Sequence, residues 1–440
     1  MYQRRKDILV IGFALFAVFF GAGNLIFPPL IGVVSGNSWP AAIMGLAISG
    51  IVFPIATIIA VDHMGGEFKG LCAPVSRWFY RAYMFFFVIF ILTCGIPRQG
   101  GVGIETGFFS LFPALQGSKI ALVVGLLIYY GLVLFFSTRP SSVVDMIGKY
   151  LTPFLVVILA IIVISSIIWP IGIPMDTGIQ GAFSYAFLQG YQTGDVAVGI
   201  VIAGTFIQAI RAKGYDNAHE RQKAVRAAAS IALLGLLFVY GGLLYIGATG
   251  SGLFSPKMDQ TALLVSLIET SIGHIGTSVL GIGILLACLT TTIGVITTIS
   301  ELTVELSHGW MRYRTCIIVY DMLGFLLATS GVATIIKYTY PVFVLIYPMA
   351  IVLTILGCFS SYIPNHGAWK GAVAMAAVIG MYEAFSVMNS SGIIHVHSEY
   401  ATYMYNLLPL SSVGFAWLLP CMVGFIVGTI LIKVRNGKIE

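Results

Sequence analysis

Two glycines and an asparagine, Gly21, Gly23 and Asn24, interrupt the first long apolar run of the chain. A glycine costs a helix interior about 1 kcal/mol relative to alanine. We therefore predict two half-helices, 8–20 and 25–35, joined by an unwound stretch. The free N–H groups at the start of the second half-helix would favour an anion, and the glycines would let a ligand approach the backbone closely. A glycine-kinked helix packed on a neighbour is the alternative interpretation.

A second apolar segment turns polar in its middle, at Gln189, Gly190, Tyr191 and Gln192, and an acidic residue, Asp195, follows. We predict that a half-helix ends here and that its unpaired carbonyl oxygens suit a cationic group such as an ammonium. The side chains of Gln189, Tyr191 and Gln192 are candidates for closing that site, although buried tyrosines also serve as packed core. Asp195 is a candidate for a gating or ion-binding role, because ionisable residues at membrane depth are functional candidates by default.

A third constellation consists of Ala287, Thr290, Thr291 and Thr292. Positions three and four apart lie on one helix face, so the Ala287 carbonyl and the Thr290 and Thr291 hydroxyls can point at one spot. Neutral oxygens of this kind suit a hard cation such as sodium. The alternative is that these hydroxyls bond back to carbonyls of their own helix.

The remaining reactive side chains do not form an enzyme or metal centre. All seven histidines fall in loops or at span ends, and the six cysteines form no CxxC pair. An intramembrane enzyme would need a nucleophile and a base within reach of each other. Two further acids in apolar segments, Asp321 and Glu383, are interpreted as internal hydrogen-bond partners or helix-interface residues. No GxGxxG or Walker sequence is present, so ATP is not expected to drive the protein.

Composition places these motifs in a membrane. The chain has 440 residues, of which 58% are hydrophobic and 9% are charged, whereas soluble domains carry roughly 25% charged residues. We predict an all-α polytopic membrane protein. Its net charge of +6 indicates no nucleic-acid partner, because the basic residues follow the expected membrane topology.

Twelve transmembrane helices are predicted, with turn residues such as Asn37-Ser38-Trp39-Pro40 and Ile363-Pro364-Asn365 between them. The spans are 8–35 (broken), 39–61, 77–98, 119–137, 144–168, 180–211 (broken), 224–249, 275–304, 313–333, 338–360, 368–389 and 411–433. With the N-terminus in the cytoplasm, all but four of the 23 Lys and Arg fall on the cytoplasmic side, as the positive-inside rule requires. The four expected outside are Arg98, Lys119, Lys257 and Lys337. Both termini are therefore predicted to be cytoplasmic.

The two broken spans, the first and the sixth, occupy matching positions if spans 1–5 and 6–10 are two copies of one unit. Because five is odd, the second copy would have inverted topology. We predict a first repeat over 1–170, a second over 171–362, and two additional C-terminal helices over 363–440. Unwound backbone at membrane depth persists only where it is buried in protein or lines a cavity, and paired broken helices are typical of a transporter's binding site.

Five stretches resemble the BrnQ-type branched-chain amino acid:cation symporters, the LIVCS family. They are 21–29 (GAGNLIFPP), 148–153 (GKYLTP), 190–195 (GYQTGD), 287–291 (ACLTT) and 414–420 (GFAWLLP). The resemblance runs in order over essentially the whole chain. One departure is Gly194, where the family often has Met. The resemblance implies the LeuT-like fold of the APC superfamily, uptake of leucine, isoleucine and valine, sodium coupling, and location in a bacterial inner membrane.

A zwitterionic substrate of this kind needs donors for its carboxylate and acceptors for its ammonium. We assign the carboxylate to the amides of Ala22, Gly23 and their neighbours. The residues expected at the substrate are Gly21, Ala22, Gly23, Asn24, Gln189, Gly190, Tyr191 and Gln192. By the resemblance, the carbonyls of Ala17 and Phe20 would complete a sodium shell with Ala287, Thr290 and Thr291. Asn24 is a candidate ligand of a second sodium.

The leading hypothesis is therefore a secondary transporter that imports branched-chain amino acids with sodium by alternating access. Its expected partners are the small-molecule substrate and membrane lipids, with no organic cofactor and no obligate protein partner. Coupling to protons through Asp195 is the main alternative. A channel is disfavoured because no ring of carbonyls or charges is evident, and an intramembrane enzyme is disfavoured for the reasons given above.

Overall fold

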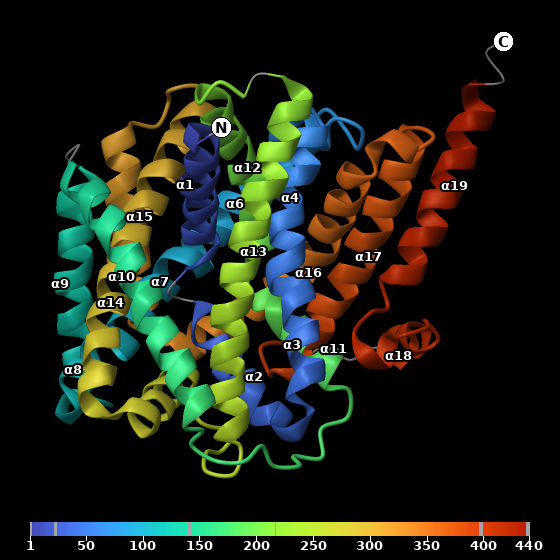
Figure 1. Cartoon of the computed structure of the whole chain (residues 1–440). Coiled ribbons are helices and arrows are strands. Elements are labelled where there is room, and N and C mark those ends of the chain that lie inside the picture. Colours follow the sequence, from blue (N-terminus) through green and yellow to red (C-terminus); the bar gives the residue numbers. More distant parts are fainter. Residues whose placement is uncertain (1, 22–23, 139–141, 216, 396–398, 437–440) are drawn as a thin grey trace.

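A computed structural model describes residues 2–21, 24–138, 142–215, 217–395 and 399–436 of the chain, and these residues form a bundle of helices with no strand. Most helices run roughly along one common direction (Figure 1). The first helix begins, and the last helix ends, toward the same end of the bundle (Figure 1). That arrangement agrees with an even number of crossings.

Both predicted interruptions are confirmed. The first span consists of α1 (Tyr2–Phe19) and α2 (Phe27–Ser35), separated by non-helical backbone and a turn. The sixth consists of α11 (Ala182–Gly190), the 3₁₀ turn η7 (Tyr191–Thr193) and α12 (Asp195–Ala212). The continuous, merely kinked helix considered as the alternative for the first run is therefore not what the chain adopts.

Every other predicted span falls on a helix or a run of helical segments. These are α3 (Trp39–Ala47) with α4 (Phe53–His63), α6 (Phe79–Phe90) with α7 (Ile96–Val102) and α8 (Phe109–Leu111), α9 (Lys119–Ser137), α10 (Ser142–Ile168), α13 (Ala218–Thr249), α14 (Gln260–Leu306), α15 (Tyr313–Ala328), α16 (Val332–Cys358), α17 (His366–Ser390) and α19 (Leu418–Asn436). Short helices α5 (Phe68–Cys72) and α18 (Glu399–Asn406) lie between them. Among the described residues, 8 helical runs are long and apolar enough to cross a membrane, and three shorter apolar helices accompany them. The total of twelve spans stays a prediction.

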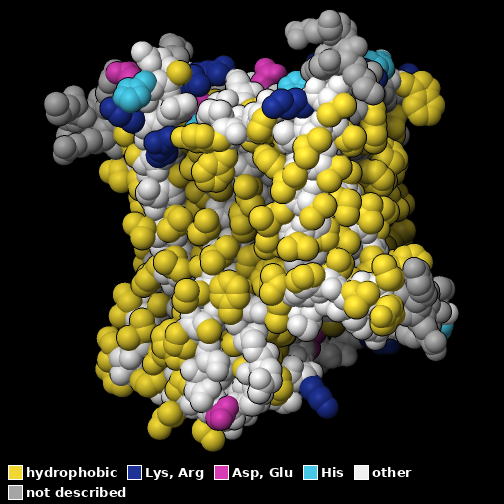
Figure 2. Space-filling view, turned by 90° about the vertical axis from the view of Figure 1, so that its right-hand side faces the viewer, with side chains coloured by type: hydrophobic (Ala, Val, Ile, Leu, Met, Phe, Trp, Pro, Cys, Tyr) yellow, Lys and Arg dark blue, Asp and Glu magenta, His cyan; other side chains and the backbone are white. Residues whose placement is uncertain are grey.

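The surface has the apolar belt that a bilayer requires. Hydrophobic side chains cover the middle of the face shown in Figure 2, while the visible Lys and Arg gather mainly at its upper end. Ile120, Leu127, Ile161 and Leu431 are among the large apolar side chains left exposed. Contiguous exposed apolar surface of this extent indicates contact with lipid rather than water.

Glycine residues let the half-helices α2 and α11 pack closely against the neighbouring helices α13 and α3. An ideal Cβ on Gly32 of α2 would lie 2.0 Å from the Leu244 carbonyl oxygen of α13. A Cβ on Gly45 of α3 would lie 2.1 Å from the Phe183 carbonyl oxygen of α11. Close backbone approach through glycine is a common way for helices to associate in membranes. The half-helices α2 and α11 are thus fixed on α13 and α3.

The third span is longer than predicted. The helical run continues for 33 residues from Phe79 to Leu111, with π-helical turns η4 (Ile91–Gly95) and η5 (Gly103–Phe108) inside it. The predicted end at residue 98 is wrong. Pro97 lacks an N–H and would ordinarily disturb a helix, but here it enters the first turn of α7 directly after a π turn. Arg98, expected outside the membrane, therefore lies within the bundle.

Candidate binding site between the two broken helices

The first break removes the helical hydrogen-bond donors of two backbone carbonyls. In a continuous helix the amides of Gly21 and Asn24 would donate to Ala17 and Phe20. Instead Gly21 N donates to the Phe19 oxygen at 3.0 Å, and Asn24 N donates to the Gly21 oxygen at 2.8 Å. The carbonyls of Ala17 and Phe20, expected as sodium ligands, thus lose their helical donors.

Ala22 and Gly23, expected to bind the substrate carboxylate through their amides, lie outside the described residues. Phe19, the last residue of α1, is buried, and its carbonyl also accepts a hydrogen bond from the Tyr240 hydroxyl at 3.2 Å. Tyr240 therefore joins α13 to the end of α1.

The second break depends on two glycines. Gly194 has φ of 75°, a left-handed conformation that glycine adopts without a steric penalty. An ideal Cβ on Gly190 would lie 2.0 Å from Ser49 Oγ and 3.1 Å from Ser49 Cβ, so the glycine lets the end of α11 pack closely against the π turn η3 (Ile48–Val52). The Gly190 carbonyl accepts from Thr193 Oγ1 at 2.9 Å.

A buried guanidinium lies between the breaks. Arg98, with 5% of its surface exposed, donates through Nη1 to the Gln192 carbonyl at 2.5 Å and through Nη2 to the Thr193 carbonyl at 3.4 Å. These are carbonyls of the second break, where we expected a cationic group. The cation that the structure places there belongs to the protein itself.

Asn24 joins the two breaks directly. Its Nδ2 donates to Asp195 Oδ1 at 3.1 Å and to Oδ2 at 3.0 Å, while its Oδ1 accepts from Arg98 Nη2 at 3.4 Å. Asn24 and Asp195 are 3% and 6% exposed. The carboxamide thus bridges an acid and a base in the protein interior, and the oxygen expected to bind a second sodium is bonded to Arg98.

Tyrosines pack around the second break. The Tyr191 ring stacks near the Tyr347 ring with centroids 4.6 Å apart, and both side chains are fully buried. The Tyr347 hydroxyl lies 3.1 Å from Thr193 Oγ1 and accepts from Val196 N at 3.3 Å. Gln192 Nε2 donates to Gln189 Oε1. Tyr191 is thus part of a packed aromatic cluster, and its contact with substrate stays a prediction.

Three buried polar atoms at or near the breaks have no hydrogen-bond partner among the described residues. They are Arg98 Nε, Gln99 Oε1 and the Tyr191 hydroxyl. Gln99 faces the first break, because an ideal Cβ on Gly21 would lie 3.7 Å from Gln99 Nε2. Leaving a buried polar group unpaired costs about 1–3 kcal/mol, so a polar ligand that pairs with these atoms would be favoured.

Sequence reasoning missed Arg98, Gln99, Tyr240 and Tyr347. A signal for the first two was present, since Arg98-Gln99 stands between the apolar residues Ile91–Ile96 and a run of glycines. A charge inside such a segment marks an intramembrane site.

On the threonine face of α14, the Thr290 hydroxyl bonds to carbonyls of its own helix, which is the alternative considered for this residue. Thr290 Oγ1 donates to the Leu286 and Ala287 carbonyls of its own helix, each at 3.1 Å. Thr292, which lies on a different side, is 2.8 Å from the Tyr129 hydroxyl of α9. The helix itself packs against α2. Convergence of Ala287, Thr290 and Thr291 with the α1 carbonyls stays a prediction.

Asp321 and Glu383, the other two acids predicted in apolar segments, form no hydrogen bond with this network among the described residues. Glu383 Oε1 accepts from the Tyr405 hydroxyl at 2.8 Å, which joins α17 to the short helix α18. Asp321 is buried in α15. Glu383 therefore has the internal hydrogen bond that we expected for it.

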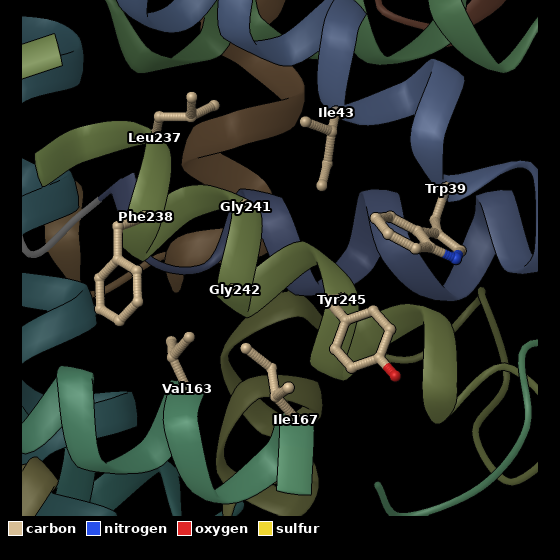
Figure 3. A pocket seen from close by; sticks show the side chains of 9 residues that line it. All are labelled: Trp39, Ile43, Val163, Ile167, Leu237, Phe238, Gly241, Gly242 and Tyr245. Atoms are coloured by element: carbon tan, nitrogen blue, oxygen red, sulfur yellow. The ribbon is translucent and has the colours of Figure 1, made fainter. Parts of the chain in front are cut away.

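An apolar groove of about 550 Å³ lies elsewhere, between α3, α10 and α13 (Figure 3). Its polar side-chain atoms are the Trp39 Nε1 and the Tyr245 hydroxyl, and Ile43, Val163 and Leu237 are typical of the rest. Two polar side-chain atoms are too few to pair with both the carboxylate and the ammonium of a zwitterion. Among the described residues, no group of three or more His, Cys, Asp or Glu could hold a metal ion.

Comparison with known proteins gives a consistent result over the whole chain. The family model described as branched-chain amino acid transport protein matches residues 4–435. The chain is 34% identical over 442 residues to the branched-chain amino acid permease BraB of Bacillus subtilis, covering 97% of this chain and 95% of that protein. It is 32% identical to the branched-chain amino acid transport system 3 carrier protein of Pseudomonas aeruginosa, covering 94% and 93%.

Two solved transporters share the fold. The inward-facing conformation of Mhp1 aligns with a TM-score of 0.55 at 14% identity, covering 96% of this chain and 91% of that one. A manganese transporter of Eremococcus coleocola aligns with a TM-score of 0.58 at 14% identity, covering 98% and 96%. At this identity the likeness concerns the fold alone, and it confirms the LeuT-like all-α architecture.

Proposed function

The chain belongs to the branched-chain amino acid transport protein family, and on that premise we propose that it imports leucine, isoleucine and valine together with sodium by alternating access. It is a transporter and not an enzyme. Its relatives are named as permeases and carriers of branched-chain amino acids, which supports this substrate class.

The observation that carries the proposal is the meeting of two broken helices at a buried polar network. Asn24 of the first break contacts Asp195 of the second, and Arg98 donates hydrogen bonds to Asn24 and to the Gln192 carbonyl. Unwound backbone and unpaired buried atoms such as Gln99 Oε1 are favourable for a small zwitterion. An aliphatic side chain would find apolar surroundings among the buried residues nearby.

Sodium coupling is supported by the backbone of the first break. The carbonyls of Ala17 and Phe20 have lost their helical donors, and neutral oxygens are suitable ligands for a hard cation. We propose that they bind sodium together with Ala287, Thr290 and Thr291 of α14. In that state the Thr290 hydroxyl would turn from its own helix toward the ion.

We further propose that the protein lies in a bacterial inner membrane with both termini in the cytoplasm. The distribution of Lys and Arg supports that orientation. Alternating access would then proceed by movement of one five-helix repeat against the other around the fixed site.

Proton coupling through Asp195 is the second candidate, because this acid is buried directly at the second break. Replacing sodium with choline distinguishes sodium coupling from proton coupling. Purified protein in sealed proteoliposomes is given radiolabelled leucine under an inward sodium gradient, an inward proton gradient, or choline alone. Unlabelled amino acids are then added as competitors.

We expect accumulation of leucine under the sodium gradient and competition by isoleucine and valine. Uptake driven by protons but unchanged by replacing sodium with choline, and abolished in Asp195→Asn, would favour the second candidate. The absence of gradient-dependent accumulation would reject both.

A further inference from the structure

The carbonyls at the end of the first half of the sixth span are bound by a guanidinium. A helix end leaves its last carbonyl groups without intrahelical partners, and these groups need other donors when buried. Arg98 supplies donors to two of them, at Gln192 and Thr193. Arg98 comes from α7, which belongs to neither broken span.

The remaining contacts of Arg98 complete a cation site. Asn24 Oδ1 accepts from Nη2. The guanidinium carbon lies 5.4 Å from the centroid of the Phe27 ring and 5.8 Å from that of Phe343, within the range of a cation–π contact. Neutral oxygens and aromatic faces from both broken helices and α16 therefore surround one positive charge.

We propose that Arg98 is a tethered cation: its guanidinium fills the cation site that the second break creates and holds that break against Asn24 of the first. Arg98 is thus a positioning residue for transport. It keeps the two unwound segments aligned for the substrate without being carried across the membrane. The inference rests on the proposed function only in placing the substrate at these breaks.

One consequence concerns coupling ions. A guanidinium already occupies the oxygen of Asn24 and the carbonyls of Gln192 and Thr193. A second sodium at Asn24 would have to displace this charge or bind beside it, and like charges close together in a low-dielectric interior repel strongly. The place proposed for a second coupling ion is therefore taken by Arg98.

Chemical rescue tests the proposal. Arg98→Ala leaves space for a small cation, Arg98→Met fills that space without charge, and Arg98→Lys keeps the charge but loses the planar fork. Arg226→Ala removes an exposed arginine and is the matched control. Leucine uptake and thermal unfolding of each full-length variant are measured with and without millimolar guanidinium chloride, well below denaturing concentrations.

In both uncharged variants, Arg98→Ala and Arg98→Met, the rate of leucine uptake is expected to fall by at least about tenfold, because the hydrogen bonds made by a charged group are lost. Guanidinium should restore uptake and raise the unfolding temperature of Arg98→Ala but not of Arg98→Met. Arg98→Lys should retain more activity than Arg98→Met, and Arg226→Ala should match the unsubstituted protein throughout.

Equal activity of the Lys and Met variants, or a folded Arg98→Ala that guanidinium leaves unchanged, would overturn the proposal. If Arg98→Ala does not fold, comparing leucine uptake by Arg98→Lys and Arg98→Met decides whether transport needs a positive charge at this position. If the unsubstituted protein fails to transport leucine, the proposed function is rejected, and the unfolding temperatures with guanidinium still decide whether Arg98 fills a cation site.

Discussion

Asn24 is the residue through which the two breaks meet, and its carboxamide uses both ends: Nδ2 donates to Asp195 and Oδ1 accepts from Arg98. A carboxamide can bridge an acid and a base in this way because it carries both a donor and an acceptor. Buried networks of this type fix one geometry when every member is satisfied. Here Gln99 Oε1 is left without a partner among the described residues, which points to a ligand at the same place.

Gln99→Leu is expected to raise the KM for leucine by about tenfold, which corresponds to about 1.4 kcal/mol, because a polar group facing the first break is lost. Gln116→Leu alters an exposed glutamine and should leave the KM unchanged. Leucine uptake over a range of substrate concentrations measures both. Equal KM values for the two variants would mean that Gln99 does not contact the substrate.

Thr291→Val is expected to raise the sodium concentration for half-maximal uptake by about tenfold, since one neutral oxygen would be removed from the proposed shell. The control is Thr298→Val on the same helix, where an exposed hydroxyl bonds back to the Gly294 carbonyl. Sodium titration of leucine uptake measures the effect. An unchanged sodium requirement in Thr291→Val would exclude this hydroxyl as a ligand.

At the scale of the helices, the second break depends on glycine at two positions, through the left-handed φ of Gly194 and the close packing of Gly190. Gly190 lies so close to Ser49 that a Cβ would clash with its hydroxyl. Gly190→Ala is expected to reduce uptake strongly, because overpacking of this kind costs about 1–3 kcal/mol or forces α11 away from η3. Uptake and membrane insertion are measured together.

Two further variants make this test specific. Gly131→Ala places a methyl where no atom lies within 4 Å, so it should be neutral. Adding Ser49→Gly to Gly190→Ala removes the clashing side chain and should restore part of the uptake. A Gly190→Ala protein that transports normally would show that this close approach is not needed.

Both breaks could be predicted from sequence, because Gly21, Gly23 and Gly190 stand in segments that otherwise read as apolar helix. Arg98 is not placed correctly from sequence, because the predicted third span ends at residue 98 whereas its helical run continues to Leu111. Pro97 follows the π turn η4 within that run, and π turns have no clear sequence pattern. Tyr240 and Tyr347 read as ordinary core residues, since only the tertiary fold brings their hydroxyls to the breaks.

At the scale of the whole molecule, a buried ion pair joins the two predicted repeats. Arg221 Nε of α13 lies 2.6 Å from Asp62 Oδ1 of α4, and the two side chains are 10% and 1% exposed. Asp62→Asn is expected to destabilise the fold, because breaking a buried pair on one side costs about 3–5 kcal/mol. The unfolding temperature in detergent should fall clearly.

The exposed pair between Lys213 and Asp7, 3.3 Å apart, provides the comparison. Lys213→Met should shift the unfolding temperature little, because exposed pairs contribute about 0–1 kcal/mol. Similar shifts for Asp62→Asn and Lys213→Met would mean that the buried pair does not hold the repeats together.

Equilibrium binding of radiolabelled leucine to the purified, detergent-solubilised protein tests most directly whether the two breaks bind an amino acid together with sodium. Coupled ligands strengthen each other's binding reciprocally. Replacing choline by sodium should therefore lower the Kd for leucine by about tenfold, and leucine should lower the half-saturating sodium concentration by the same factor. An identical Kd in sodium and choline, or no leucine binding in either, would contradict joint binding of an amino acid and sodium.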